Sequence, residues 1–353
     1  MSAHGGSETV EDHGEDWRSV VENKAEQPRT VGDLVRAREP GRGREATAPE
    51  EIPAKGWKDI LWRVVWATSE DRILATAGSV AFFALLAVFP AIATVVSLYG
   101  IFNDASTIGS HLTLLAGILP QGVLDLIAEQ IRLITSKSTD ALGIAFIVGL
   151  LVALWSANSG VAALFDALNV VYGEKEKRSL LHFYALTFLF TLGSIGFVIA
   201  ATTGVVVLPL VLKIFGAATT AEQLLAYLRW PALLAVVVGV LALVYRYGPS
   251  RHDAKWRWVT WGSAVAAGLW IATSMLFSWY VVNFDSYNRI YGSLGAGIGF
   301  MTWIWLSVVV VLLGAELNAE TEHQTARDTT TGKPKPLGAR GATMADHIGE
   351  AQD

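Results

Sequence analysis

Polar side chains recur at helical spacing inside one long apolar run of this sequence. They stand three or four residues apart along it, with the small Ala162 at the same spacing: Trp155, Asn158, Ser159, Ala162, Asp166 and Asn169. At about 100° per residue they fall on one stripe of a helix, which must face other helices or water because polar groups in hydrocarbon lack partners. The stripe indicates either a polar pathway for a solute, with Asp166 as its charged member, or hydrogen bonds that join helices. Because Asp166 lies near the end of the run, a third interpretation is a simply hydrated carboxylate.

A second carboxylate lies near the end of the last apolar run, in the segment LLGAELNAE. Glu316 stands there at the C-terminal end of a predicted helix, where the helix dipole disfavours a negative charge. A compensating cation is therefore expected, and Arg178 and Arg246 in neighbouring loops are candidates. Glu316 is interpreted either as a gate or coupling residue for transport or as half of a structural ion pair.

Small residues stand four apart at the start of the same run. Gly292 and Ala296 form one pair, and Gly295 and Gly299 form another. Small side chains at this spacing let helix backbones approach closely, so this face is predicted to pack against another helix. The same face could instead join two copies of the chain in a homo-oligomer. The loose glycine fingerprint here follows no strand, which argues against nucleotide binding.

Catalytic and metal-binding motifs are missing from the sequence. The seven histidines do not pair at metal-ligand spacing, there is no cysteine, and no HExxH, GxSxG or P-loop lysine motif is present. No convergent pair of nucleophile and base is visible. A net charge of −5 is not that of a broadly basic, nucleic-acid-binding chain. We therefore expect neither an enzyme nor a nucleic-acid-binding protein, and neither a metal nor a cofactor.

The composition predicts an all-α, polytopic membrane helical bundle in contact with the lipid bilayer. Charged residues make up 17% of the 353, below the roughly one quarter that is typical of soluble domains. Six apolar runs are long enough to cross a bilayer as helices. They are 73–102, 141–163 (continuing helically towards 172), 183–212, 230–247, 259–284 and 294–317. Pro90 in the first run and Pro209 in the third are predicted to kink their helices.

The remaining segments divide the chain around a membrane domain of residues 55–320. Residues 1–54 are polar and are predicted to form a disordered tail, because they have little apolar surface to bury. Residues 56–70 are predicted to form an amphipathic helix at the level of the lipid headgroups. Residues 103–140 are predicted to form an external amphipathic segment, although a surface loop with incidental periodicity is the alternative. Residues 321–353 form a C-terminal tail.

Lysine and arginine in the short loops predict the orientation of the six spans. One side holds Lys55, Lys58, Arg63, Arg72, Lys175, Lys177, Arg178, Arg246, Arg251, Lys255 and Arg257. The other side holds fewer: Arg132, Lys137, Lys213, Arg229 and Arg289. Basic residues favour the cytoplasmic side, so both termini are predicted to be cytoplasmic. No secretory signal precedes the first run, so insertion is expected to rely on the spans themselves.

Four blocks of the sequence resemble one family. They are AGSVAFFALLAVFPAIATVVSLYGIF (77–102), ALWSANSGVAALFDALNVVYGE (153–174), LVYRYGPSRHDAKWRWVTWGS (243–263) and FSWYVVNFDSYNRIYGSLGAGIGFMTWIWLSVVVVLLGAELNAE (277–320). Together they resemble the YihY/BrkB family of bacterial inner-membrane proteins, over roughly residues 60–320. The resemblance implies a bundle of six membrane helices in the bacterial inner membrane and a suspected transport role. It also implies that the family's historical label, ribonuclease BN, is a misassignment, and it supplies no catalytic motif.

Two functions are weighed from these observations. The leading hypothesis is a transporter or exporter of a small solute, indicated by the polar stripe, the prolines within the spans and the small-residue face. The alternative is a membrane scaffold or stress-related protein that recruits soluble partners through its two tails. The sequence does not name the solute, the direction or the energy source.

The orientation can be tested with single cysteines, because the chain has none of its own. Cysteines placed at Ser110 and Ser179 are expected to react with a membrane-impermeant thiol reagent from opposite faces of the membrane. Labelling of both positions from one face would refute the six-span arrangement.

Overall fold

The computed structural model describes residues 31–102, 139–203, 219–283 and 295–352. Its helices are α2 (Val31–Arg36), the 3-10 turn η1 (Pro49–Glu51), α3 (Ala54–Glu70), α4 (Ile73–Phe102), α7 (Thr139–Val171), α8 (Leu180–Thr202), α10 (Thr219–Tyr247), α11 (Trp256–Asn283), α13 (Gly295–Glu322) and α14 (Thr343–Asp346). Among the described residues the one β contact is an isolated bridge between Ala254 and Thr330.

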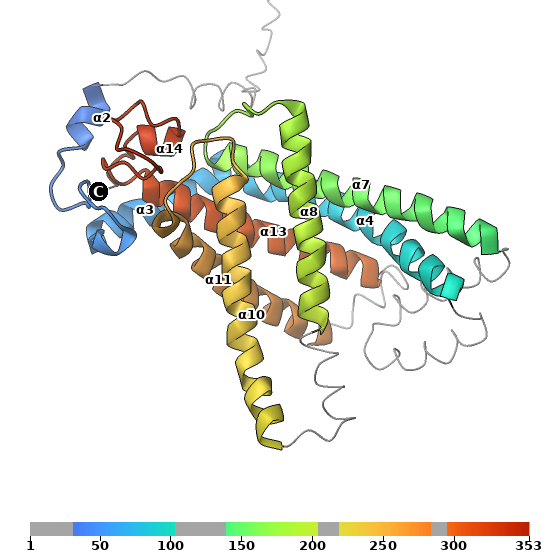
Figure 1. The fold of residues 1–353 in the computed structure, drawn as a ribbon. Helices are drawn as coiled ribbons and strands as arrows, with labels where there is room; N and C mark the ends of the chain where they lie inside the picture. The colour runs from blue at the N-terminus through green and yellow to red at the C-terminus, as the bar shows by residue number, and fades with distance from the viewer. Residues whose placement is uncertain (1–30, 103–138, 204–218, 284–294, 353) are drawn as a thin grey trace, which may run out of the picture.

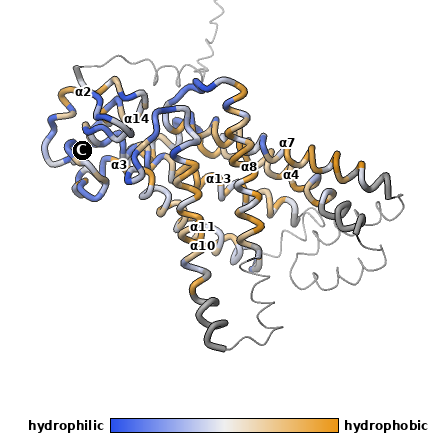
Figure 2. Tube along the Cα trace, viewed as in Figure 1, coloured by the Kyte–Doolittle hydropathy of each residue, from blue (hydrophilic) through white to orange (hydrophobic). Residues whose placement is uncertain are grey.

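Six of these helices are long and apolar enough to cross a membrane: α4, α7, α8, α10, α11 and α13. Figure 2 shows them as mainly hydrophobic, whereas the part of the chain around α2, α3 and α14 is mainly hydrophilic. The predicted six-helix, all-α class is therefore confirmed. The first run becomes α4 with the predicted bounds, and the others shift at their ends.

Of the two prolines predicted to kink their helices, one lies among the described residues. Pro90 lies inside α4, where its carbonyl accepts a hydrogen bond from the Thr94 hydroxyl at 2.7 Å. Pro209 lies outside the described residues, as does nearly all of the predicted external segment 103–140. Pro231 was not predicted as a kink, but it also lies inside a helix, because α10 already begins at Thr219.

Helix α13 occupies the centre of the bundle, in contact with α3, α4, α7, α11 and α14. Helices α4 and α7 run side by side along much of their length, α8 packs on α7, and α10 packs on α11 (Figure 1). In the same view, α8 and α10 point away from the α4–α7 pair with increasing distance from α14. Helices α8 and α10 therefore diverge from the α4–α7 pair away from the end near α14.

Helices α11 and α13 approach each other closely at two glycines. A Cβ at Gly262 would overlap the backbone oxygen of Gly314, and one at Gly314 would overlap Ala266. The Asn318 side chain completes this crossing by accepting a hydrogen bond from the Gly262 amide at 2.8 Å. Close contact without Cβ atoms is the usual device for joining helices in lipid.

The predicted small-residue packing face does not coincide with this crossing. A Cβ at Gly299 would meet nothing within 4 Å, and Gly295 and Ala296 begin α13 far from Gly314. Gly292 lies outside the described residues. Gly299 therefore does not serve tight packing within the described chain, and a role in homo-oligomers stays a prediction.

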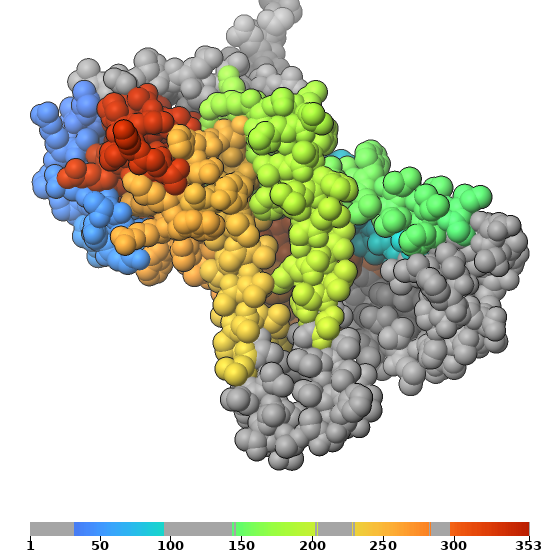
Figure 3. Space-filling view, viewed as in Figure 1, coloured from blue at the N-terminus to red at the C-terminus, as the bar shows by residue number. Residues whose placement is uncertain are grey.

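Residues 31–54 correct the prediction of a disordered tail over 1–54. They pack against the C-terminal segment, which folds back onto them, as the adjoining blue and red surfaces in Figure 3 show. We call the joint unit of residues 31–70, 172–179, 248–255 and 320–352 the head. Its segments are polar, but buried arginines such as Arg42 and Arg44 bind carboxylates and backbone carbonyls. Ordering is thus supported by hydrogen bonds and ion pairs where apolar surface is scarce.

The α11–α13 crossing predicts a contrast between two glycine substitutions. Gly262→Ala is expected to lower the free energy of unfolding by about 1–3 kcal/mol, because the added methyl forces the helices apart. Gly299→Ala, with open space around it, is the matched control and is expected to be neutral or slightly stabilising. Thermal unfolding of the purified protein in detergent measures both. Equal unfolding temperatures for the two variants would contradict the crossing.

Candidate functional site at the junction of the helices and the head

The polar stripe of α7 does not converge on one cavity. Trp155 is 66% exposed and Asp166 is exposed as well, while the Ser159 hydroxyl donates to the carbonyl of Trp155 in its own helix at 2.9 Å. Asn158 accepts a long hydrogen bond, 3.4 Å, from Thr191 on α8. The contacts of Asn158 match the interpretation of hydrogen bonds between helices, and they leave Trp155 and Asp166 on the outside.

Asn169, the last residue of the stripe, is buried and ties two loops together. Its amide donates to Glu176 at 3.1 Å, and its carbonyl oxygen accepts from the backbone of Ser250 at 2.7 Å. Arg178 then binds Glu176 at 2.6 Å and donates to the Gly248 carbonyl at 2.8 Å. The α7–α8 and α10–α11 loops are therefore clamped to each other. Burial alone would raise the pKa of Glu176, but hydrogen bonds from Arg178 and Asn169 outweigh it and lower that pKa to about 2.

A fully buried ion pair connects these loops to the end of α13. Arg251 donates to both carboxylate oxygens of Glu322, at 2.8 and 3.0 Å, and both side chains are completely buried. The guanidinium also lies 4.1 Å from the ring centroid of Tyr172, and Thr329 donates to Glu322 at 2.8 Å. Two charges in such a place are tolerated only when their hydrogen bonds are well satisfied.

Glu316 lies within the same junction and is fully buried. Burial raises the pKa of the Tyr172 hydroxyl. The nearby charge of Arg251 opposes this rise, and the charge of Glu316 adds to it. The two cations suggested by the sequence are engaged elsewhere: Arg178 binds its own loop, and Arg246 donates to the carbonyl of Ala254. Glu316 thus stands deeper in the protein than a carboxylate at a solvated helix end.

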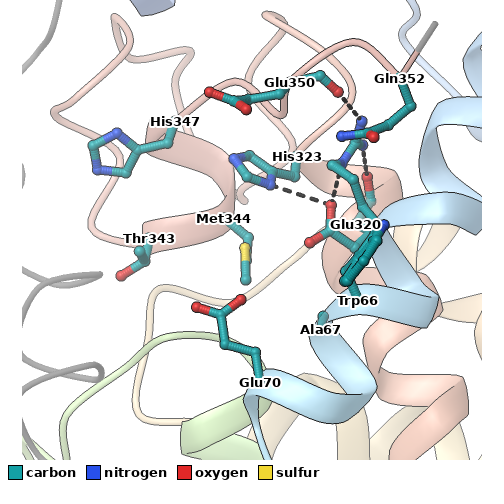
Figure 4. A pocket seen from close by; sticks show the side chains of 11 residues that line it. Trp66, Ala67, Glu70, Glu320, His323, Thr343, Met344, His347, Glu350 and Gln352 are labelled. Atoms are coloured by element: carbon teal, nitrogen blue, oxygen red, sulfur yellow. Dashed lines mark hydrogen bonds and ion pairs between the residues drawn. The ribbon is translucent and has the colours of Figure 1, made fainter. Parts of the chain in front are cut away.

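The head contains an open pocket of about 520 Å³ between α3, the end of α13 and the C-terminal segment (Figure 4). Arg63 donates to Glu320 at 2.6 Å and to the side-chain oxygen of Gln324 at 2.7 Å, and His323 lies 3.2 Å from Glu320. Glu70 points into the pocket in Figure 4. The remaining wall residues are Trp66, Ala67, Thr343, Met344, His347, Glu350 and Gln352.

A second buried pair holds α3 to the residues before it. Arg42 donates to both oxygens of Asp59, at 2.7 and 2.9 Å, and the backbone amide of Gln352 donates to the same carboxylate. Burial opposes the charge of Asp59, but the bonds from Arg42 and Gln352 lower its pKa below the ordinary value. Neither this cluster nor the pocket was predicted from the sequence, since their members come from opposite ends of the chain. Among the described residues no group of three or more histidine and acidic side chains is arranged to hold a metal ion.

Six apolar helices joined at one end by buried polar groups define a multi-pass membrane protein of the helical-bundle class. The family model for the virulence factor BrkB matches residues 64–337, and the chain belongs to this family. The match includes all six spans and about half of the head's C-terminal segment.

Relatives in other bacteria agree with this assignment. A putative ribonuclease-like protein, YfkH, of Bacillus subtilis is 31% identical over 48% of this chain and 63% of its own length. The chain therefore spans less than two thirds of that relative. A UPF0761 membrane protein of Vibrio parahaemolyticus is 29% identical over 72% of this chain and 80% of its own, and one of Alkalilimnicola ehrlichii is 27% identical over 88% and 70%. No solved structure gave a significant match. With the six helices, these relatives place the chain in the bacterial inner membrane.

The loop clamp predicts a loss of stability in acid. Because the folded pKa of Glu176, about 2, lies below the ordinary value of 4.5, its contribution is present at neutral pH and is lost as the pH falls from about 5 towards 2. Glu176→Gln is therefore expected to be less stable than the wild type at neutral pH and to lose less on acidification. Unfolding temperatures across this range measure the difference, with exposed Glu45→Gln as the control. Parallel pH profiles for wild type and Glu176→Gln would contradict the role of the clamp.

Proposed function

We propose that the protein transports a small solute across the bacterial inner membrane and that Glu316 belongs to the gated end of its pathway. The observation that carries the proposal is the fully buried carboxylate of Glu316 on the central helix α13. An ionisable group inside a membrane bundle is costly to retain, because burying its charge costs several kcal/mol. Such groups mark ion, proton or solute pathways.

The arrangement of the helices supports an alternating-access cycle. Loops and helix ends meet where Arg251 binds Glu322 and where Arg178 clamps two loops, and α8 and α10 diverge from the α4–α7 pair away from this point (Figure 1). A pathway closed on one side by breakable polar contacts is one state of such a cycle. Glu316 lies beside the closed side, where gain or loss of a proton would change the cost of opening.

Asp166 becomes the second candidate, because its side chain is exposed whereas that of Glu316 is enclosed by the protein. The proposal requires no catalytic group, metal or cofactor, and it leaves the solute unnamed. The scaffold alternative gains one specific observation, the open pocket of the head, but charged lining residues such as Arg63, Glu320 and Glu350 already form ion pairs.

Paired intracellular and extracellular metabolite profiling tests the proposal. The strains are a null, and the null carrying wild type, Glu316→Gln, Asp166→Asn or the exposed control Glu45→Gln. A solute that accumulates on one side in the null is expected to be corrected by wild type and Glu45→Gln. Glu316→Gln is expected to lose at least about tenfold of this flux, the effect of roughly 1.4 kcal/mol on a limiting step.

Membrane levels of each variant, measured by fluorescence-detected size exclusion, separate loss of transport from loss of folding. If no solute moves in any strain while a stress phenotype follows the gene, the scaffold alternative replaces transport. If the Glu316→Gln variant transports the solute normally, the proposal of transport stands and the role assigned to Glu316 is wrong.

A further inference from the structure

Helix α3 turns its charged side chains inward and its apolar side chains outward. Asp59 and Arg63 are buried and bonded within the head, at 0% and 8% exposure. The opposite face exposes large apolar side chains: Leu61 at 56%, Trp62 at 49%, Val65 at 63% and Trp66 at 64%. A helix on a water-facing surface would show the reverse arrangement.

The neighbours of α3 place it at the level where two spans end. Ile60 is fully buried in a cluster with Trp258, near the start of α11, and Leu317, near the end of α13. Trp57 lies against Trp261 in the second turn of α11, with ring centroids 6.1 Å apart. Helix α3 therefore lies across the bundle's edge at the depth where these helices leave the apolar region.

The exposed apolar face is continuous with a membrane-spanning helix. Helix α3 ends at Glu70, a tight turn with a positive φ of 49° at Arg72 follows, and α4 starts at Ile73. The next residue, Leu74, is again 55% exposed. Exposed tryptophans beside aliphatic residues are the side chains that favour the lipid–water boundary.

Two lysines supply charge complementarity to the same face. Lys55 and Lys58 are exposed in the first turns of α3, on the side that carries Trp62 and Val65. Their flexible stems can extend from an apolar surface to the phosphate level. Lysines within a Debye length of a membrane surface attract anionic headgroups.

We propose that the outer face of α3, formed by Leu61, Trp62, Val65 and Trp66, is embedded in the headgroup boundary of the bilayer that holds the spans. Lys55 and Lys58 bind anionic phospholipid headgroups there. This contact goes beyond transport and does not depend on it. Because Asp59 and Arg63 on the inner face hold the head together, the contact also fixes the head against the membrane.

Depth measurement on the full chain in nanodiscs tests the embedding. A spin label is attached to a single cysteine at Val65. Two reference positions are labelled in the same way: Leu189, 63% exposed on α8, for lipid, and exposed Glu45 for water. The chain has no native cysteine to interfere. The Val65→Cys label is expected to favour collisions with oxygen over a polar nickel complex, as Leu189→Cys does. Collision rates like those of Glu45→Cys would overturn the proposal. Low access to both reagents, together with dipolar broadening, would also overturn it, by showing that a second copy of the chain covers this face instead of lipid.

Lipid selectivity tests the role of the lysines. A bimane on Val65→Cys is quenched by doxyl-labelled phosphatidylglycerol or phosphatidylcholine in nanodiscs of equal composition. Preferential quenching by phosphatidylglycerol of roughly twofold or more is expected, and it should be lost in Lys55→Gln/Lys58→Gln. Lys333→Gln/Lys335→Gln, which removes two exposed lysines of the C-terminal segment, is the control and should keep the preference. Equal quenching by both lipids, or equal effects of the two double variants, would overturn the headgroup assignment.

Discussion

The polar C-terminal end of α13 makes the contacts on which the rest of the structure depends. Residues two apart along it bind different parts of the chain: Asn318 binds α11, Glu320 binds Arg63 of α3, and Glu322 binds Arg251 of the α10–α11 loop. One helix thereby holds the membrane spans and the head together. Removing one partner of such a buried pair would leave an uncompensated charge, which is costly in a low-dielectric interior.

This polar joint explains why the protein has two different kinds of core. Within the bundle, apolar side chains and glycine contacts such as Gly262 with Gly314 bring helices together. Within the head, buried arginines such as Arg42 and Arg44 add ion pairs and hydrogen bonds to a small apolar cluster around Ile52 and Ile60. Contacts of the first kind suit lipid-facing helices, since lipid supplies no hydrophobic drive between spans. Contacts of the second kind can be broken by protonation or by competing groups.

The membrane itself takes part in this arrangement. Helix α3 presents apolar side chains outward while its charges stabilise the head, so one short helix satisfies both environments. The helical period of its sequence indicates an amphipathic helix, but the period alone does not say which face meets the protein. The face that carries Asp59 and Arg63 turns towards the protein. Arg42 binds Asp59 there, and Arg63 binds Glu320 and Gln324.

The sequence by itself determined the helical class, the number of spans and the bounds of α4, because apolar run length and backbone hydrogen bonding dictate helices in lipid. It also singled out Asn169 and Glu316, since polar groups are rare in such runs. Only the tertiary structure decided that Asp166 is exposed while Glu316 is buried, that Gly314 rather than Gly299 makes the close crossing, and that residues 31–54 fold against the C-terminal segment. These outcomes depend on pairing between residues up to about 300 positions apart, such as Arg44 with the Gly349 carbonyl at a separation of 305. Local periodicity carries no information about such partners.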